Sequence, residues 1–211
     1  MKLILVRHGE TAWVKERRYQ GSTDVPLNAR GKLQARSVAR LIKKEQPIAV
    51  YSSELARAHE TAGLIANACK KRVKVDGRLN EIFFGHWEGK PHRAIWDQFP
   101  KEAQRWYEAR WTSKPPGGES LGSLKNRVSS FLKETLKCFG DQDATCVIVS
   151  HGGPIRMFMV ELFEMNPKIF WSLRIDTASV SVITVKPKWS ELVLLNSQAH
   201  LNGLRRGGHA A

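Results

Sequence analysis

The sequence predicts an α/β fold: a three-layer sandwich with a largely parallel central sheet, helices on both faces and a small helical cap insertion. Two patterns lead to this prediction. Short, nearly all-apolar runs are typical of strands buried on both faces, and they alternate with longer amphipathic segments typical of helices. A stretch rich in aromatic residues interrupts the alternation, which indicates an insertion. The 211 residues are enough for one sizeable core.

The first third of the chain predicts three strands and two helices. Residues 2–7 contain four apolar residues in succession, so we expect a buried strand there. In residues 28–44 apolar or small side chains recur every three or four positions, which predicts a helix. Residues 48–51 form the second strand candidate, and the similarly spaced residues 55–69 the second helix. Residues 73–75 could add a short edge strand.

The middle of the chain predicts the cap. Eight bulky aromatic residues lie among polar residues between positions 82 and 111, together with Pro91 and Pro100. Prolines are rare inside sheets, so this composition favours short helices with an aromatic core of their own. A Pro-Pro-Gly-Gly loop follows at residues 115–118. We therefore place the cap insertion at about residues 82–118.

The last part of the chain returns to the alternating pattern. Apolar residues along 121–136 predict a long helix, and the apolar run 146–149 predicts a third buried strand. Gly152-Gly153-Pro154 opens another helix, since proline is tolerated at an early helical position. Residues 179–185 and 192–195 complete the sheet as strands. The chain thus reads as one domain over residues 1–202, and residues 203–211 form a basic tail expected to be flexible.

Composition limits the classes of partner. Lys and Arg number 34 against 20 Asp and Glu, a net charge of +14 that raises the local concentration of anionic ligands. The basic clusters are short and lack interleaved aromatics, so nucleic acid is not the expected partner. Three cysteines without a C-x-x-C pair argue against a disulfide framework or a zinc site. No apolar run reaches the ~18 residues of a membrane helix, and no signal peptide is recognisable. We expect a cytoplasmic protein without a membrane partner.

Reactive side chains follow three of the predicted strands. Arg7 and His8 end the first strand, Arg57 lies on the helix after the second, and His151 follows the strand at 146–149. The carboxyl ends of parallel strands meet at one sheet edge, where ligands bind in such folds. Guanidinium groups match phosphate oxygens, and imidazole can attack phosphorus. Glu81, in the loop before the cap, could supply a proton to a leaving alcohol.

Five ordered motifs strengthen this interpretation. They read RHGET at 7–11, LNARGKLQA at 27–35, SSELARAHETA at 52–62, LNEIFFGHWEG at 79–89 and SHGG at 150–153. In these motifs the sequence resembles the histidine phosphatase superfamily, which has the phosphoglycerate mutase-like fold, from residue 7 to residue 201. The resemblance implies a phosphoric monoester hydrolase that requires no metal and no cofactor.

The resemblance also implies the role of each site residue. His8 would attack phosphorus and become a phosphohistidine, with its other ring nitrogen oriented by a backbone carbonyl near Gly9. Arg7, Arg57 and His151 would bind the phosphoryl oxygens and the charge on them. Glu81 would protonate the leaving oxygen and later take a proton from water.

The resemblance implies further candidates for substrate contact. They are the loop residues Gln20, Gly21, Ser22 and Thr23, and Gly152 after the second histidine. In one position the chain departs from the family, which commonly has an asparagine three residues after Thr11. This chain has Val14 there, so the detailed geometry of the phosphate pocket is expected to differ.

The substrate is less strongly indicated than the chemistry. The short segment after Glu81 resembles the phosphatase branch of the family, and residues 79–85 with 117–120 are most similar to α-ribazole phosphatases, which act in cobalamin nucleotide-loop assembly. Broad-specificity and phosphoserine phosphatases share most of the motifs and stay open as alternatives. We expect a small phosphomonoester as the partner, and a homodimer is compatible with the sequence.

Two other classes of protein were weighed. A non-catalytic protein that binds phospho-ligands or nucleic acid is a distant alternative, because mere binding needs neither the nucleophile His8 nor the proton donor Glu81. Residues 118–122 match the G-x-S-x-G pattern of serine hydrolases. That pattern requires a buried strand directly before it, and here a proline-rich loop precedes it instead. We interpret the match as fortuitous.

Overall fold

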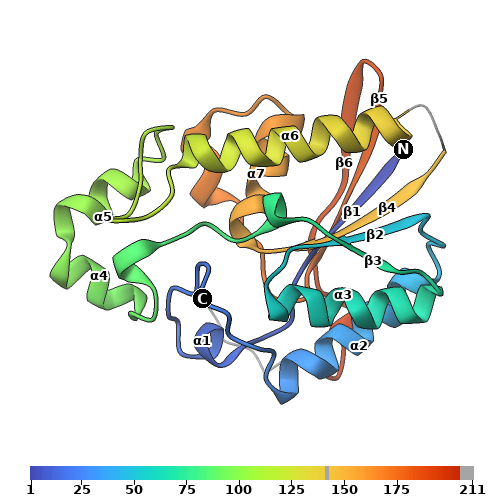
Figure 1. The fold of residues 1–211 in the computed structure, drawn as a ribbon, viewed down its shortest axis with the longest axis horizontal. Coiled ribbons are helices and arrows are strands. Elements are labelled where there is room, and N and C mark those ends of the chain that lie inside the picture. Colours follow the sequence, from blue (N-terminus) through green and yellow to red (C-terminus); the bar gives the residue numbers. More distant parts are fainter. Residues whose placement is uncertain (141–142, 205–211) are drawn as a thin grey trace.

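The computed structural model describes residues 1–140 and 143–204, and their strands form one six-stranded sheet (Figure 1). The strand order is β3-β2-β4-β1-β5-β6. The strands are β1 (Lys2–Arg7), β2 (Ala49–Ser52), β3 (Val73–Val75), β4 (Thr145–Ser150), β5 (Val180–Lys186) and β6 (Trp189–Ser197). β3, β2, β4 and β1 pair in parallel. β5 pairs antiparallel with both β1 and β6, so the largely parallel sheet expected from the sequence is confirmed.

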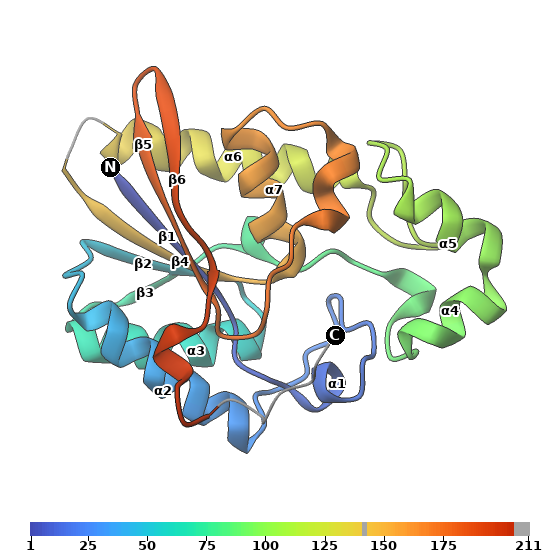
Figure 2. The same ribbon diagram turned by 180° about the vertical axis from the view of Figure 1, so that it is seen from behind.

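Helices cover both faces of this sheet, as Figures 1 and 2 show. The α-helices are α1 (Ala12–Lys15), α2 (Ala29–Lys43), α3 (Ala56–Cys69), α4 (His92–Gln98), α5 (Pro100–Tyr107), α6 (Leu121–Phe139) and α7 (Gly152–Leu162). Helices α2 and α3 pack on one face, and α6 and α7 on the other. The three-layer sandwich is therefore confirmed. In the part of the chain that the structure describes, no helix is both long and apolar enough to cross a membrane.

The central strands explain why their sequences are continuously apolar. Side chains alternate across a strand, so Leu3 and Leu5 of β1 join the core beneath α6 and α7. Ile4 and Val6 join the core beneath α2 and α3. Neither face of β1 meets water, and each of these four side chains is at most 1% exposed. This burial holds the carboxyl end of β1, and the reactive residues that follow it, in a fixed position.

The segment predicted as the cap extends from one end of the sandwich (Figure 2). It contains the short helices α4 and α5 and a 3₁₀ turn at Gly85–Trp87. Trp87 and Trp106 are fully buried and meet edge to face, with ring centroids 6.3 Å apart. Both rings belong to the same core as Leu3 and Leu5 of β1, and Phe83, Trp96 and Tyr107 are exposed. The expectation that this stretch forms an aromatic core of its own is therefore only partly met, because the buried rings extend the core of the sandwich.

A few features differ from the sequence expectations or lie beyond them. The single helical turn α1 was not predicted; it begins where the Thr11 side chain accepts a hydrogen bond from the Val14 amide. β6 is longer than the predicted 192–195, because its start at Trp189 pairs with Lys186 across a two-residue turn. Most of the expected basic tail, residues 205–211, lies outside the described residues.

Candidate active site

The reactive residues gather where three adjacent strands end. β2, β4 and β1 are neighbours in that order, and their carboxyl ends share one edge. His8 follows β1, and its amide donates to the Ser150 carbonyl at the end of β4 at 3.0 Å. His151 follows β4, and the two imidazole centroids are 5.0 Å apart. Residues widely separated in sequence are thus brought together as the strand pattern predicted.

His8 is a neutral imidazole, and one of its ring nitrogens, Nδ1, is engaged in a hydrogen bond with the backbone. Its Nδ1 lies 2.7 Å from the Gly9 carbonyl oxygen, which is the orienting contact expected from the sequence. Burial lowers the pKa of His8 well below its ordinary value, and the positive charges of Arg57 and Arg7 lower it further. A neutral ring that donates from Nδ1 carries its lone pair on Nε2. His8 therefore has the protonation state that a nucleophile requires.

His151 is also neutral but presents the opposite tautomer. The Nε of Arg57 donates to its Nδ1 at 3.2 Å, so Nε2 carries the hydrogen. That Nε2 lies 2.7 Å from the hydroxyl oxygen of Ser53, which can accept from it. Burial is the main cause of the lowered pKa of His151, followed by the charge of Arg57. Ser53 was not singled out from the sequence, although it lies in the motif at 52–62.

The two arginines predicted to bind phosphate are partly committed to backbone carbonyls. The terminal nitrogens of Arg57 donate to the carbonyls of Thr23 and Gly21, at 2.9 and 2.6 Å. Burial lowers the pKa of Arg57 to about 10. Arg7 donates to the Ile175 carbonyl at 2.6 Å, while its buried Nε has no hydrogen-bond partner among the described residues. An unpaired buried donor on a cation is costly, so this group is suited to receive an anion.

Glu81 is placed by the first turn of α7. One of its carboxylate oxygens accepts from the amides of Ile82 and Gly153, both at 3.0 Å. Gly153 has no space for a side chain, because a Cβ there would lie 2.4 Å from the same oxygen. The glycine pair after His151 therefore lets the carboxylate approach the helix end, where amide hydrogens are unpaired.

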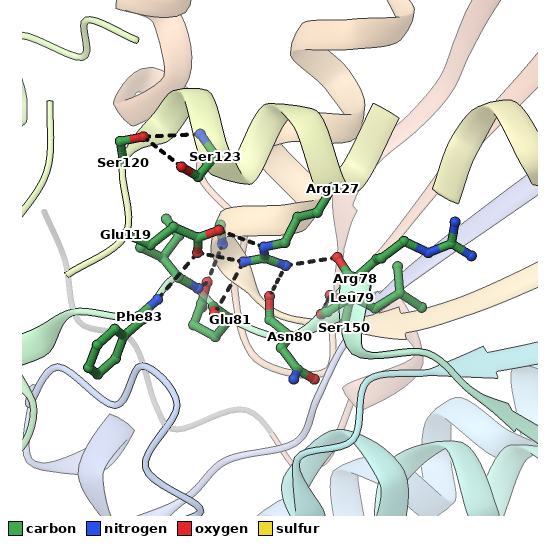
Figure 3. A network of polar contacts seen from close by, with 12 residues as sticks. Arg78, Leu79, Asn80, Glu81, Phe83, Glu119, Ser120, Ser123, Arg127 and Ser150 are labelled. Atoms are coloured by element: carbon green, nitrogen blue, oxygen red, sulfur yellow. Dashed lines mark hydrogen bonds and ion pairs between the residues drawn. The ribbon is translucent and has the colours of Figure 1, made fainter. Parts of the chain in front are cut away.

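A second set of contacts holds the Glu81 loop from the side of α6 (Figure 3). Arg127 donates hydrogen bonds to three backbone carbonyls of that loop, those of Arg78 (2.8 Å), Asn80 (2.6 Å) and Glu81 (3.3 Å). Its guanidinium also pairs with both carboxylate oxygens of Glu119, at 2.7 and 2.8 Å. Sequence reasoning missed Arg127, whose position on a helix face carries no catalytic signature.

The loop at residues 20–23 is occupied by contacts within the protein. Gln20 accepts a hydrogen bond from the Thr11 hydroxyl at 2.7 Å. The amides and hydroxyls of Ser22 and Thr23 donate to the carboxylate of Glu88. Gln20 and Gly21 line a cavity that Arg7 and Glu81 also line, whereas Ser22 and Thr23 are not among its lining residues. Their role as substrate ligands stays a prediction.

A cavity of about 350 Å³ opens beside these groups. Arg7, Glu81 and Gly152 line it, and Val14 takes the place where the family commonly has asparagine. Aromatic rings from the cap and from residue 171 form another wall, and Arg17, Arg18 and Arg156 add positive charge. An anionic, partly apolar ligand in this cavity would therefore lie next to Glu81, the expected proton donor.

The serine hydrolase pattern has a structural explanation. Ser120 is the residue before α6, and its hydroxyl accepts a hydrogen bond from the Ser123 amide at 3.0 Å (Figure 3). No strand leads into residue 120. Ser120 is thus a helix cap, and the interpretation of the match as fortuitous is confirmed.

Comparison with known proteins gives a consistent result. The model of the family described as "Histidine phosphatase superfamily (branch 1)" matches residues 3–198. "Phosphoserine phosphatase 1" of Hydrogenobacter thermophilus is 38% identical over 211 residues, which is 100% of this chain and 99% of that protein. "Adenosylcobalamin/alpha-ribazole phosphatase" of Escherichia coli is 32% identical over 199 residues, 94% of this chain and 97% of that protein.

Solved structures of phosphatases also superpose on this chain over nearly its whole length. A mutant phosphoserine phosphatase from Entamoeba histolytica in complex with phosphoserine superposes with a TM-score of 0.85 at 30% identity, covering 95% of this chain and 98% of that one. The α-ribazole phosphatase of Shigella flexneri gives a TM-score of 0.83 at 32% identity, covering 94% and 98%. The chain belongs to branch 1 of the histidine phosphatase superfamily, and it is a phosphatase that hydrolyses phosphoric monoesters.

Proposed function

We propose that the protein hydrolyses small phosphomonoesters through a phosphohistidine formed on His8, without help from a metal ion. The observation that supports this most is the state of His8 itself: a buried neutral imidazole whose Nδ1 is committed to Gly9 and whose Nε2 keeps its lone pair. The Nε of Arg7, which has no hydrogen-bond partner within the described part of the chain, can bind a phosphoryl oxygen, and the carboxyl group of Glu81 can protonate the leaving oxygen.

In the first step the lone pair of His8 Nε2 attacks phosphorus, and the ester P–O bond breaks. The leaving oxygen takes a proton from Glu81 and departs as the alcohol. Arg7, Arg57 and His151 stabilise the charge on the phosphoryl oxygens. In the second step a water molecule attacks the phosphohistidine and gives its proton to Glu81. The P–N bond breaks, inorganic phosphate forms, and both His8 and Glu81 return to their starting protonation states.

Two substrate candidates deserve comparison. Residues 79–85 with 117–120, and the E. coli relative, favour α-ribazole 5′-phosphate, whose leaving alcohol is neutral. The cations of the cavity and the H. thermophilus relative favour phosphoserine, whose leaving alcohol carries a carboxylate. We place phosphoserine first. Its leaving alcohol, serine, is a zwitterion whose carboxylate a cavity guanidinium can bind with two parallel hydrogen bonds, whereas α-ribazole offers no anionic group.

A panel of esters tests both levels of the proposal. Phosphate release is measured in excess chelator from phosphoserine, α-ribazole 5′-phosphate, 3-phosphoglycerate, a sugar phosphate and an aryl phosphate. A lead in kcat/KM of about 100-fold, or ~2.7 kcal/mol of transition-state discrimination, identifies the preferred substrate. Equal rates across the panel would instead indicate a broad-specificity enzyme.

The His8→Ala variant tests the mechanism. It should release no phosphate above the uncatalysed rate, and it should not acquire the acid-labile phosphoryl group expected on the wild-type protein after rapid mixing with substrate. Turnover by His8→Ala would contradict a phosphohistidine on His8. If the wild-type protein hydrolyses nothing, the binding-protein alternative gains support, and a steep salt dependence of DNA affinity would identify a nucleic-acid ligand.

A further inference from the structure

Arg156 lies next to the reaction centre, although no motif drew attention to it. It is on α7, four residues after Gly152, and it lines the same cavity as Arg7 and Glu81. A Cβ built on Gly152 would be 2.9 Å from Nη1 of Arg156 and 3.8 Å from the second carboxylate oxygen of Glu81. The guanidinium and the carboxylate therefore flank the same glycine.

The guanidinium of Arg156 is fixed at its base. Its Nε donates to the Leu173 carbonyl at 2.7 Å. Its central carbon lies 5.9 Å from the ring centroid of Phe170 and 5.7 Å from that of Trp171, within the range of cation–π attraction. Within residues 1–140 and 143–204, its terminal nitrogens have no hydrogen-bond acceptor and no ion-pair partner. The side chain is thus held in one orientation, while Nη1 and Nη2 are available to donate hydrogen bonds to a ligand.

The surroundings of Arg156 make an anionic ligand favourable. Burial lowers the pKa of Arg156 to about 10, and the nearby charge of Arg7 lowers it as well, while the negative charges of Glu81 and Asp176 act in the opposite direction. The cavity lining contains several guanidinium groups but, among its residues, the single carboxylate of Glu81, so a further anion would lower the free energy of this arrangement. The single phosphoryl group of a monoester is already served by the groups around His8.

The other cavity cations are less suited to this task. Arg18 is committed to the Glu16 carboxylate at 2.6 Å and to the Gly89 carbonyl at 2.7 Å. Arg17 is exposed, and its backbone has a positive φ of 56°. Arg156 is less exposed than Arg17, and it lies beside Glu81, the expected proton donor.

We infer that Arg156 forms a leaving-group subsite that binds a carboxylate of the substrate, so that the enzyme acts on phosphorylated hydroxy or amino acids. The inference rests on the proposed function, because it takes Glu81 as the donor to the leaving oxygen. A group beside Glu81 then faces the alcohol part of the ester. A guanidinium matches a carboxylate with two parallel hydrogen bonds, which a neutral leaving group cannot form.

A matched pair of substrates isolates this contact. Phosphoserine and phosphoethanolamine differ only in the carboxylate. The wild-type protein should prefer phosphoserine in kcat/KM by about 10- to 100-fold, the range for a charged hydrogen-bonded group. In Arg156→Met this preference should fall to less than about 3-fold, through loss of the phosphoserine rate while phosphoethanolamine is hydrolysed nearly as before. Arg156→Lys should restore part of the preference.

Arg110→Met is the control variant. The Arg110 side chain is 72% exposed and pairs with Glu108 in the cap, outside the cavity, so both rates should stay unchanged. Two results would overturn the subsite. One is an equal loss of both rates in Arg156→Met, which would make Arg156 a general phosphate ligand or a structural residue. The other is a wild-type protein that does not distinguish the two esters.

Binding measurements separate this inference from the proposed function. Calorimetry with the His8→Ala protein compares the Kd of phosphoserine and phosphoethanolamine without any turnover. A tighter Kd for phosphoserine that disappears in the His8→Ala, Arg156→Met double variant supports the subsite even if wild-type turnover fails. Equal Kd values for the two esters would rule the subsite out, whatever the turnover results show.

Discussion

At the scale of single residues, the second glycine after His151, Gly153, has a testable consequence. A methyl group on Gly153 would lie 2.4 Å from a Glu81 oxygen and 2.7 Å from Ile82, so Gly153→Ala must displace the carboxylate. General acid catalysis contributes about 10²–10⁴-fold. We therefore expect kcat for phosphoserine to fall at least ~10-fold. An aryl phosphate, whose leaving group needs little protonation, should lose less.

Gly63→Ala provides the matched control for this prediction. A Cβ on Gly63 meets nothing within 4 Å, and the residue lies inside α3, away from the site. Its rates on both esters should equal those of the wild type. Equal losses for the two esters in Gly153→Ala would mean that the substitution disturbs more than Glu81.

The two site histidines should make stability depend on pH. The pKa values of His8 and His151 lie well below 6.5, so the unfolded chain binds protons that the folded protein does not. The free energy of unfolding should therefore fall as the pH drops below 6.5, by up to about 1.4 kcal/mol per pH unit for each histidine. Urea unfolding between pH 5 and 7.5 measures this slope. In His8→Asn the slope should be smaller by about 1.4 kcal/mol per pH unit, the contribution of one proton. An unchanged slope would contradict a buried neutral His8 in the folded protein.

At the residue scale, the sequence predicted which reactive side chains would lie close together, while their catalytic roles stay predictions. His8, His151 and Arg57 stand at strand ends or in motifs, and the structure places them within one cluster. Ser53 and Arg156 were missed for a different reason. A serine that accepts from an imidazole, or an arginine one helical turn beyond a glycine, has no signature until the chain has folded.

At the scale of elements, the clamp formed by Arg127 and Glu119 links α6 to the catalytic loop (Figure 3). Arg127→Met removes donors from three loop carbonyls and leaves Glu81 less well oriented. We expect kcat to fall about 10-fold or more for phosphoserine, in line with loss of general acid catalysis. The KM should change little, because Arg127 does not line the cavity.

A control variant and a control substrate distinguish an effect on Glu81 from a general loss of structure. Lys133→Met removes a positive charge from the exposed face of the same helix and should leave both parameters unchanged. An aryl phosphate should be hydrolysed by Arg127→Met at nearly the wild-type rate. If the aryl ester suffers as much as phosphoserine, the residue supports the fold and not the orientation of Glu81.

The bounds of most elements could be predicted because burial determines them. The run 2–7 is apolar throughout since both faces of β1 are covered, and the observed strand has the same bounds. The turn α1 could not be predicted from periodicity. Its four residues are too few to show a repeat, and a single capping contact from Thr11 starts it. Likewise, the direction in which β5 pairs with β1 is decided by tertiary packing.

At the scale of the whole molecule, the positive charge and the site should act together. A net charge of +14 attracts anionic esters over distances of about one Debye length, ~10 Å at 0.1 M salt. Attraction of anionic esters is thus one use for the positive charge, and the absence of a nucleic-acid partner stays a prediction. The cytoplasmic location, the independence from metals and the homodimer stay predictions from the sequence.

The order of the strands also has a consequence for how the protein reaches its active form. β1 pairs with β4, so Lys2 lies opposite Thr145, and the two histidines meet only when segments far apart in the sequence have associated. Pairing of such distant segments is slow because a long loop must close before any contact repays its entropy. After dilution from denaturant, helical circular dichroism should therefore recover before phosphatase activity does. Simultaneous recovery would show that the central strands pair at the start of folding.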